Sequence, residues 1–256
     1  MIEQNNGPAQ QQKAEMRAIT ISRQYGSGGG EIALRLAQRL GWRLLDHDAV
    51  VHVAQQLGIS VEEAEEHDEH VESLGVRILT SMQMIQPTMA ASLPVQITPN
   101  IREYHEALCR VVEATVRQEK TVVVGRGGQM LFAGRRDILH ARVVAPLEQR
   151  VAYVMRREGL EYDAAMTRVH EKDQGRIRYL QAQYHRHPSD PLLYDLVVNT
   201  GVLSLDRCVD LICLALEAKA ERLTLPEEKL GPATEMPPYP GQPADFLVPP
   251  DTGSTH

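Results

Sequence analysis

A glycine-rich loop between a strand pattern and a helix pattern is the feature that most restricts how this chain can fold. Residues 18–22 form a β-branched run, residues 26–30 hold four glycines and a serine, and apolar residues then recur at helical spacing from Ile32 to Leu40. Successive glycines let backbone N–H groups converge, and the start of the helix adds its dipole, so this order favours anion binding. The same layout also occurs as a plain tight connection without a ligand.

The loop has the shape of a P-loop but lacks two of its side chains. The pattern GxxxxGK[ST] places a lysine at the β- and γ-phosphates and a hydroxyl at Mg²⁺. After Gly29 the chain continues with Gly30, Glu31, Ile32 and Ala33, so neither side chain is present. A cation for a bound phosphate therefore has to come from another part of the chain.

Charge indicates the kind of ligand. The 256 residues carry a formal net charge of −7, which argues against a nucleic-acid partner. Between Arg135 and Arg186, however, the sequence has eleven lysines and arginines and seven acidic residues. A locally basic segment in an acidic protein suits a small anionic ligand.

Cysteines and hydropathy indicate the compartment. The three cysteines are odd in number, and Cys208 and Cys213 fall in an apolar helical stretch where buried thiols are expected. No apolar leader opens the chain and no apolar run approaches the length of a membrane span, so we expect a cytoplasmic protein without a membrane partner. His67 and His70 lie in an acidic run, which we interpret as a solvated helix face, and no protein metal site is predicted.

Strand and helix patterns alternate along the chain and predict one domain at residues 17–224. The polar residues 1–16 and the proline-rich residues 225–256 are expected to be disordered tails. Strands are expected at 17–22, 42–45, 121–124, 138–145 and 194–200, and helices at 30–40, 101–119, 147–157, 161–183 and 204–219. This alternation predicts a three-layer α/β domain with a mainly parallel five-stranded sheet. Residues 49–100 are expected to hold further helices and, at 82–99, a flap.

One predicted helix has a basic face. Arg168, Lys172 and Arg176 are spaced four residues apart between residues 161 and 183. Like charges at this spacing repel each other, so we favour an anion bound against them over a merely solvated surface.

Five segments, taken in this order, resemble the nucleoside monophosphate kinases of the P-loop fold, most closely the cytidylate kinase-like family. They are ITISRQYGSGGGEIA (19–33), RLLDHDAV (43–50), TVVVGRGG (121–128), EKDQGR (171–176) and YDLVVNTGVLSLD (194–206). The resemblance implies a P-loop nucleoside-kinase-like domain in which a basic helical lid closes over two nucleotides.

The resemblance also implies a role for particular residues. The glycine loop would bind the phosphates of ATP through Gly26, Ser27, Gly28, Gly29 and Gly30. Asp46 would begin the monophosphate-binding region, and Arg126 would bind the monophosphate itself and take part in catalysis. In the lid, Asp173 and Arg176 would act in catalysis, and Arg23 would supply the missing cation.

The basic lid adds two more expected substrate-binding residues, Arg168 and Arg178. Mg²⁺ would bridge the β- and γ-phosphates and be held by Asp46 or through water.

The predicted function is transfer of the ATP γ-phosphate to a nucleoside monophosphate, with CMP or dCMP favoured by the resemblance. Because the loop lysine is absent, two alternatives stay open. The chain could be a nucleotide-sensing or partner-binding module with weak or no turnover, or a kinase for another small metabolite. The sequence does not determine an oligomeric state.

Overall fold

The computed structural model describes residues 15–46 and 101–234. The helices and flap predicted within residues 49–100 lie outside the described residues, as does most of both predicted tails. The chain divides into two compact units, residues 1–223 and 224–256, of which the first contains the sheet. The predicted domain boundary near residue 224 stays a prediction.

The first unit is built on a five-stranded sheet in the order β2-β3-β1-β4-β5, and every pairing is parallel. The strands are β1 (Ala18–Arg23), β2 (Arg43–Leu45), β3 (Thr121–Val124), β4 (Ile138–Val144) and β5 (Leu196–Asn199). The predicted parallel sheet is confirmed. In such a sheet all carboxyl ends meet at one edge, where ligands of open α/β folds bind.

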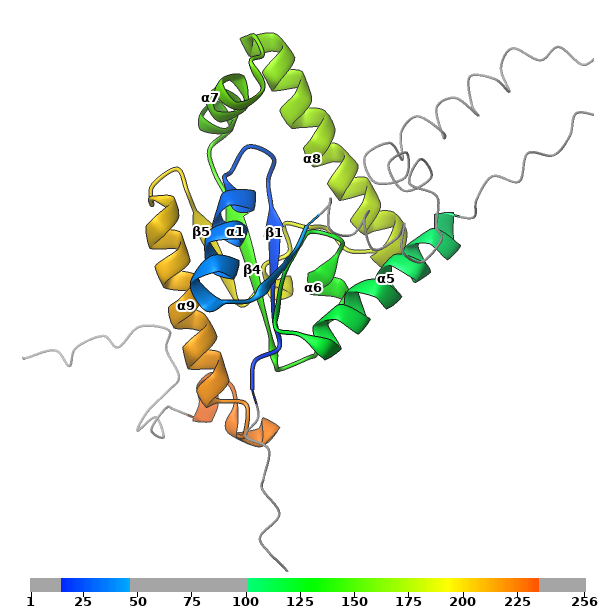
Figure 1. Cartoon of the computed structure of the whole chain (residues 1–256), viewed down its shortest axis with the longest axis vertical. Coiled ribbons are helices and arrows are strands. Elements are labelled where there is room, and N and C mark those ends of the chain that lie inside the picture. The colour runs from blue at the N-terminus through cyan, green and yellow to red at the C-terminus, as the bar shows by residue number, and fades with distance from the viewer. Residues whose placement is uncertain (1–14, 47–100, 235–256) are drawn as a thin grey trace, which may run out of the picture. The chain divides into compact units, whose positions relative to one another are not determined.

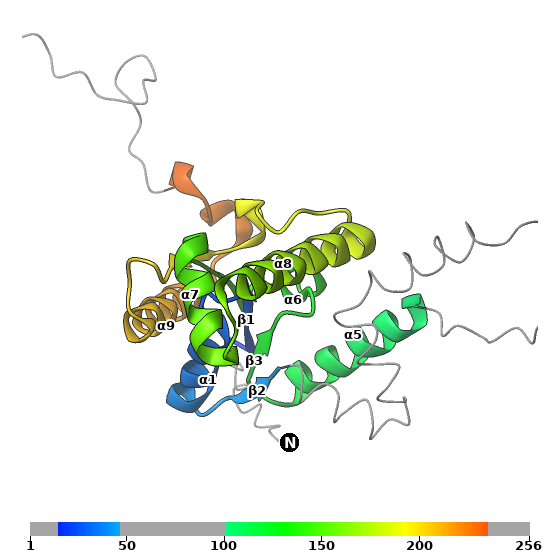
Figure 2. The same cartoon turned by 90° about the horizontal axis from the view of Figure 1, so that it is seen from above.

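Helices cover both faces of this sheet (Figures 1 and 2). One face carries α1 (Gly29–Leu40) and α9 (Leu205–Glu221), and the other carries α5 (Ile101–Gln118) and the short α6 (Gly128–Leu131). The chain thus has the three layers predicted for it. α1 begins one residue earlier than predicted and ends at Leu40 as predicted, and Gly41 (φ 64°) closes it in the left-handed conformation that favours glycine.

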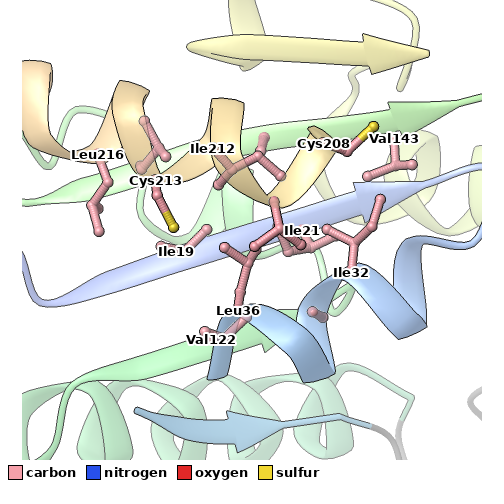
Figure 3. Close-up of a cluster of buried hydrophobic side chains, with 14 of the residues drawn as sticks. Ile19, Ile21, Ile32, Leu36, Val122, Val143, Cys208, Ile212, Cys213 and Leu216 are labelled. Atoms are coloured by element: carbon pink, nitrogen blue, oxygen red, sulfur yellow. The ribbon is translucent and has the colours of Figure 1, made fainter. Parts of the chain in front are cut away.

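The main core lies between the sheet and the pair α1 and α9 (Figure 3). Apolar side chains of β1 and β4 alternate toward it, among them Ile19, Ile21 and Val143, and meet Ile32 and Leu36 of α1. Cys208 and Cys213 are buried in the same core, as predicted. A core of this kind fixes the end of β1, and with it the start of the glycine loop.

Two further helices, α7 (Leu147–Glu158) and α8 (Tyr162–Tyr184), pack on each other above the loop (Figure 1). Their small core contains Val151, Val154, Ala165 and Val169. This pair corresponds to the lid expected from the sequence. A 3₁₀ turn, η1 (Pro191–Leu193), then leads to β5.

The second unit has two 3₁₀ turns among its described residues, η2 (Glu227–Lys229) and η3 (Pro232–Thr234). Across residues 15–46 and 101–234, none of the helices combines the length and apolar character required to cross a bilayer.

Candidate active site

The glycine loop forms the wall of a cavity of about 210 Å³ at the carboxyl end of β1. Gly26 and Gly28 both have φ of 76°, which L side chains rarely adopt. A Cβ on Gly26 would lie 2.6 Å from the carbonyl oxygen of Arg150. The five expected loop residues all line this cavity, together with Glu31, Tyr153 and Arg157.

Ser27 has a structural contact in this loop. Its buried hydroxyl donates to the carbonyl oxygen of Gln24 at 2.8 Å and lies 3.3 Å from that of Val143. The carbonyl of Ser27 in turn accepts from the Thr200 hydroxyl at 2.8 Å. The side chain therefore closes the loop on itself, and what the loop offers to a ligand is backbone N–H.

A larger cavity of about 320 Å³ adjoins the loop. Cationic side chains from the ends of three strands and from α8 line it: Arg23, Arg126, Arg142, Lys172 and Arg176. Arg23, Gln24 and Arg176 line both cavities. The two spaces thus share a wall that carries two arginines.

Arg23 crosses between the two cavities. Its Cβ lies 2.6 Å from where a Cβ on Gly29 would be, and its Nη1 passes against Gly125. Burial lowers the pKa of its guanidinium well below the ordinary value, and the charges of Arg176 and Arg126 lower it further. Asp46 opposes this shift. Among the residues that the structure describes, no carboxylate forms an ion pair with Arg23.

Arg126 lies at the carboxyl end of β3 in an unusual backbone. It has φ of 58° between two glycines that also have positive φ, Gly125 at 75° and Gly127 at 63°. A non-glycine residue in this region is strained by about 1–3 kcal/mol. Gly127 is also required sterically, because a Cβ there would lie 2.7 Å from Cε2 of Tyr184. The turn presents the Arg126 side chain to the larger cavity.

The carboxylate of Asp173 forms its contacts at the start of the glycine loop. It accepts from the backbone N–H of Tyr25 at 2.8 Å and from Nη1 of Arg150 at 2.6 Å. Arg150, only 7% exposed, also donates to the carbonyl oxygens of Tyr25 and Ala145. Asp173 and Arg150 therefore join both lid helices to the glycine loop.

Arg176 packs over the same loop. Its guanidinium lies 5.4 Å from the centre of the Tyr25 ring and 3.5 Å from the Asp173 carboxylate. Burial lowers its pKa, and the Asp173 charge opposes that shift. The Tyr25 hydroxyl donates to Glu158 at 2.5 Å, and burial together with this contact raises the pKa of Tyr25 to about 12. Arg176 is thus held above the loop, facing both cavities.

The remaining expected residues have different positions. Arg168 is exposed on α8 and lies 4.0 Å from Glu158, outside both cavities. Arg178 lies further along α8 and lines neither cavity. Asp46 follows β2 at the same sheet edge as Arg23. The acidic Glu31 is paired with Arg157 of α7, so its charge is compensated.

The sequence reasoning missed two arginines of this region, Arg142 and Arg150. The sequence did contain a signal for Arg142, because this charged residue lies in a buried strand between the apolar residues Ala141 and Val143. A charged side chain on alternate positions of such a strand needs a partner or a ligand. Arg150 had no such signal, since an arginine in a helix is ordinarily exposed.

A metal ion would find few ligands in the described part of the chain, where no group of three or more His, Cys, Asp or Glu side chains could hold one. Mg²⁺ fits this donor set nonetheless, because it keeps several waters and commonly binds one or two carboxylates together with substrate phosphates. Asp46 is a carboxylate at the correct edge of the sheet.

Comparison with known proteins identifies relatives. The chain is 24% identical over 198 residues to a cytidylate kinase of Ignicoccus hospitalis, covering 77% of this chain and 97% of that protein. A uronate isomerase of Corynebacterium glutamicum is 35% identical over 91 residues, which are 36% of this chain and only 18% of that protein.

A solved structure, of an uncharacterized protein from Eubacterium ventriosum, aligns with a TM-score of 0.57 and 18% identity, over 78% of this chain and 98% of that one. This similarity concerns the fold. The model of the cytidylate kinase-like family matches residues 18–202. The chain belongs to the cytidylate kinase-like family, a family of kinase-like nucleotide-binding proteins.

Proposed function

We propose that the protein transfers the γ-phosphate of ATP to a nucleoside monophosphate, with CMP or dCMP as the favoured acceptor. ATP phosphates would bind the glycine loop, and the acceptor would bind the larger cavity. The choice of CMP and dCMP rests on the family and on the relative named a cytidylate kinase.

The observation that carries this proposal is the shared wall of the two cavities. Arg23 and Arg176 line both spaces, so each can contact a phosphoryl group passing from one to the other. Phosphoryl transfer needs alignment of the two substrates and positive charge around the transferring group, and little covalent chemistry from the protein. Two guanidinium groups meet that need, because their planar forks match phosphate oxygens.

The charge of the larger cavity supports a phosphorylated acceptor over a neutral one. Among the residues that the structure describes, four arginines and a lysine line it together with a single carboxylate, Asp173, which is already paired with Arg150. Burial lowers the pKa of Arg23 and that of Lys172, and neighbouring cations lower both further. A bound dianion would relieve this repulsion, whereas a sugar hydroxyl would not.

Asp46 would hold Mg²⁺ directly or through water, with the remaining ligands coming from phosphate and solvent. When bound, Mg²⁺ neutralises charge on the β- and γ-phosphates. The chain's own part is to hold the phosphates at the loop N–H groups, to align them with Arg23 and Arg176, and to exclude water beneath α7 and α8.

The test is a coupled assay of ADP release with CMP, dCMP, UMP and AMP as acceptors, and with a neutral sugar as a comparison. We expect turnover with a cytidine monophosphate, none with the sugar, and loss of turnover in Arg176→Ala. The matched control is Arg117→Ala, since Arg117 is an exposed arginine paired with Glu113 on α5. The proposal is wrong if every acceptor gives the same rate in wild type and in Arg176→Ala.

A second candidate is a nucleotide sensor without turnover. Two observations favour it: the loop has no lysine, and the Ser27 hydroxyl is directed to backbone carbonyl groups. Calorimetry separates the two functions. A sensor would bind ATP with no ADP formed over hours in the presence of any nucleoside monophosphate.

A further inference from the structure

Arg142 lies outside every motif described above, yet it faces the larger cavity. It is the fifth residue of β4 and pairs in register with Ser22 of β1. Because side chains alternate along a strand and both Ala141 and Val143 enter the α1/α9 core, Arg142 points to the opposite face. That face is where the larger cavity opens.

A small polar network fixes the guanidinium of Arg142. Its Nη1 donates to the Tyr194 hydroxyl at 3.1 Å and lies 3.4 Å from the Ser22 hydroxyl, and the group stacks 5.4 Å from the Tyr194 ring centre. The Tyr194 hydroxyl has one proton, which it donates to the carbonyl oxygen of Pro188 at 2.9 Å. Tyr194 therefore accepts from Arg142, and it connects this arginine with a turn that also lines the cavity.

The charge of Arg142 lacks a counterion within the part of the chain that the structure describes. No described carboxylate forms an ion pair with it, and its hydrogen bonds to described residues all use Nη1. By contrast, the nearby Arg150 is paired with Asp173. Burial lowers the pKa of Arg176, and the charge of Arg142 lowers it further. A partly buried arginine beside another cation indicates that an anion belongs in the space between them.

The strand order places Arg142 opposite Arg126. Arg126 follows β3 and Arg142 lies on β4, and these strands flank β1 on its two sides. Since neighbouring strands are about 4.8 Å apart, β3 and β4 are separated by about 10 Å, and β1, with Ser22 in register with Arg142, lies between them. A tetrahedral dianion can accept from donors on several sides, which suits this arrangement better than a planar carboxylate does.

We propose that Arg142 binds the phosphate of the acceptor from the side opposite Arg126, and that Tyr194 is its positioning residue. This inference rests on the proposed function, because it takes the larger cavity to be the acceptor site. It narrows the acceptor to a phosphomonoester, and it makes Arg142 a determinant of acceptor affinity with no part in binding ATP.

The experiment measures binding and turnover separately, in the full-length protein. Calorimetry with CMP, with inorganic phosphate and with ATP is carried out on wild type, Arg142→Ala, Arg142→Lys and Tyr194→Phe. We expect Arg142→Ala to weaken CMP and phosphate binding roughly ten- to a hundred-fold, with ATP binding unchanged. Arg142→Lys should recover part of the loss, because it restores charge without the planar fork.

Tyr194→Phe tests the positioning role. Where turnover is measurable, it should raise the KM for the acceptor roughly two- to ten-fold and leave kcat and the KM for ATP unchanged. A merely structural role would instead lower the melting temperature and alter both substrates alike. The matched control is Arg135→Ala, since Arg135 also stacks on an aromatic ring, that of Phe132, and lies outside both cavities.

The binding arm separates failure of this inference from failure of the proposed function. If Arg142→Ala binds CMP and phosphate as wild type does, the inference is wrong even where ADP is released. If wild type binds neither CMP nor phosphate, the inference is equally overturned. If no acceptor is ever phosphorylated but Arg142→Ala still loses phosphate binding, the inference holds and the proposed catalysis fails.

Discussion

Replacing Asp173 with alanine should destabilise the free protein strongly, which distinguishes a structural carboxylate from one that only contacts ligand. The side chains of Asp173 and Arg150 are 23% and 8% exposed and lie 2.6 Å apart. Asp173→Ala leaves the buried guanidinium of Arg150 without its carboxylate, and it leaves the N–H of Tyr25 without its acceptor. Both losses occur where the lid helices meet the loop.

The size of the expected destabilisation follows from the burial of the Asp173–Arg150 ion pair. Removing one partner of a buried ion pair costs about 3–5 kcal/mol, because the other charge stays buried. For a domain of this size each kcal/mol lowers the melting temperature by about 2–4 °C, so we expect a decrease of about 6–20 °C. The double variant Arg150→Met/Asp173→Ala contains neither charge of the pair. Its melting temperature should therefore recover much of the decrease expected for Asp173→Ala alone.

The assay is thermal unfolding followed by circular dichroism, with and without ATP. Asp163→Ala is the matched control, since Asp163 is exposed in the first turn of the same helix and should cost no more than about 1 kcal/mol. A melting temperature of Asp173→Ala within about 2 °C of wild type, together with lost ATP binding, would refute the reasoning. That result would show a carboxylate that acts on ligand, as the sequence predicted for Asp173.

Three further predictions concern single side chains. Arg23→Met should leave the melting temperature without ligand unchanged or slightly raised, because it removes a buried cation whose neighbours are cations. Inorganic pyrophosphate is expected to stabilise wild type and not this variant, and a drop of several degrees without ligand would contradict the prediction. His140 is buried, and burial lowers its pKa, so the unfolded chain binds more protons than the folded chain does. The contribution of neutral His140 to stability is therefore present above about pH 6.5 and is lost as pH falls. The unfolding free energy of His140→Gln should depend less steeply on pH between about 6.5 and 5 than that of wild type. In chemical unfolding, Gly127→Ala should be less stable than Gly134→Ala by about 1–3 kcal/mol. Both glycines have positive φ, but only at Gly127 would a Cβ meet a neighbouring ring. Equal losses of unfolding free energy in the two variants would show that the Tyr184 ring moves aside.

The sheet was predictable because each strand carries its own local signal. Thr121–Val124 is a β-branched run, three valines after a threonine, as suits a strand buried on both faces, and its observed bounds match the prediction. The last helix was predicted from residue 204, and Ser204 is its N-cap, with a hydroxyl that accepts from the N–H of Arg207. The four-residue helix α6 was missed, since one turn is too short to show a helical period.

The site was predictable only in part, because charge partners are set by tertiary structure. The spacing of Arg168, Lys172 and Arg176 indicated three equivalent cations, yet Arg168 faces Glu158 while the other two line the larger cavity. Helical spacing gives the face of a helix but not what packs against each of its turns. Likewise, the sequence could not show that Asp173 would bind the N–H of Tyr25, a contact across 148 residues.

If the glycine loop binds phosphate as we propose, the position of Arg23 supplies a physical reason why the chain needs no lysine after that loop. A lysine at the start of α1 would reach the phosphates from the helix, whereas Arg23 reaches the same space from the end of β1, before the loop. This route needs room along the side chain, and Gly29 and Gly125 provide it, since a Cβ at either position would collide with Arg23. The glycines therefore serve the cation as well as the loop. Gly29 and Gly125 belong to segments nearly a hundred residues apart, so the arginine and both glycines must be present together for this geometry to exist.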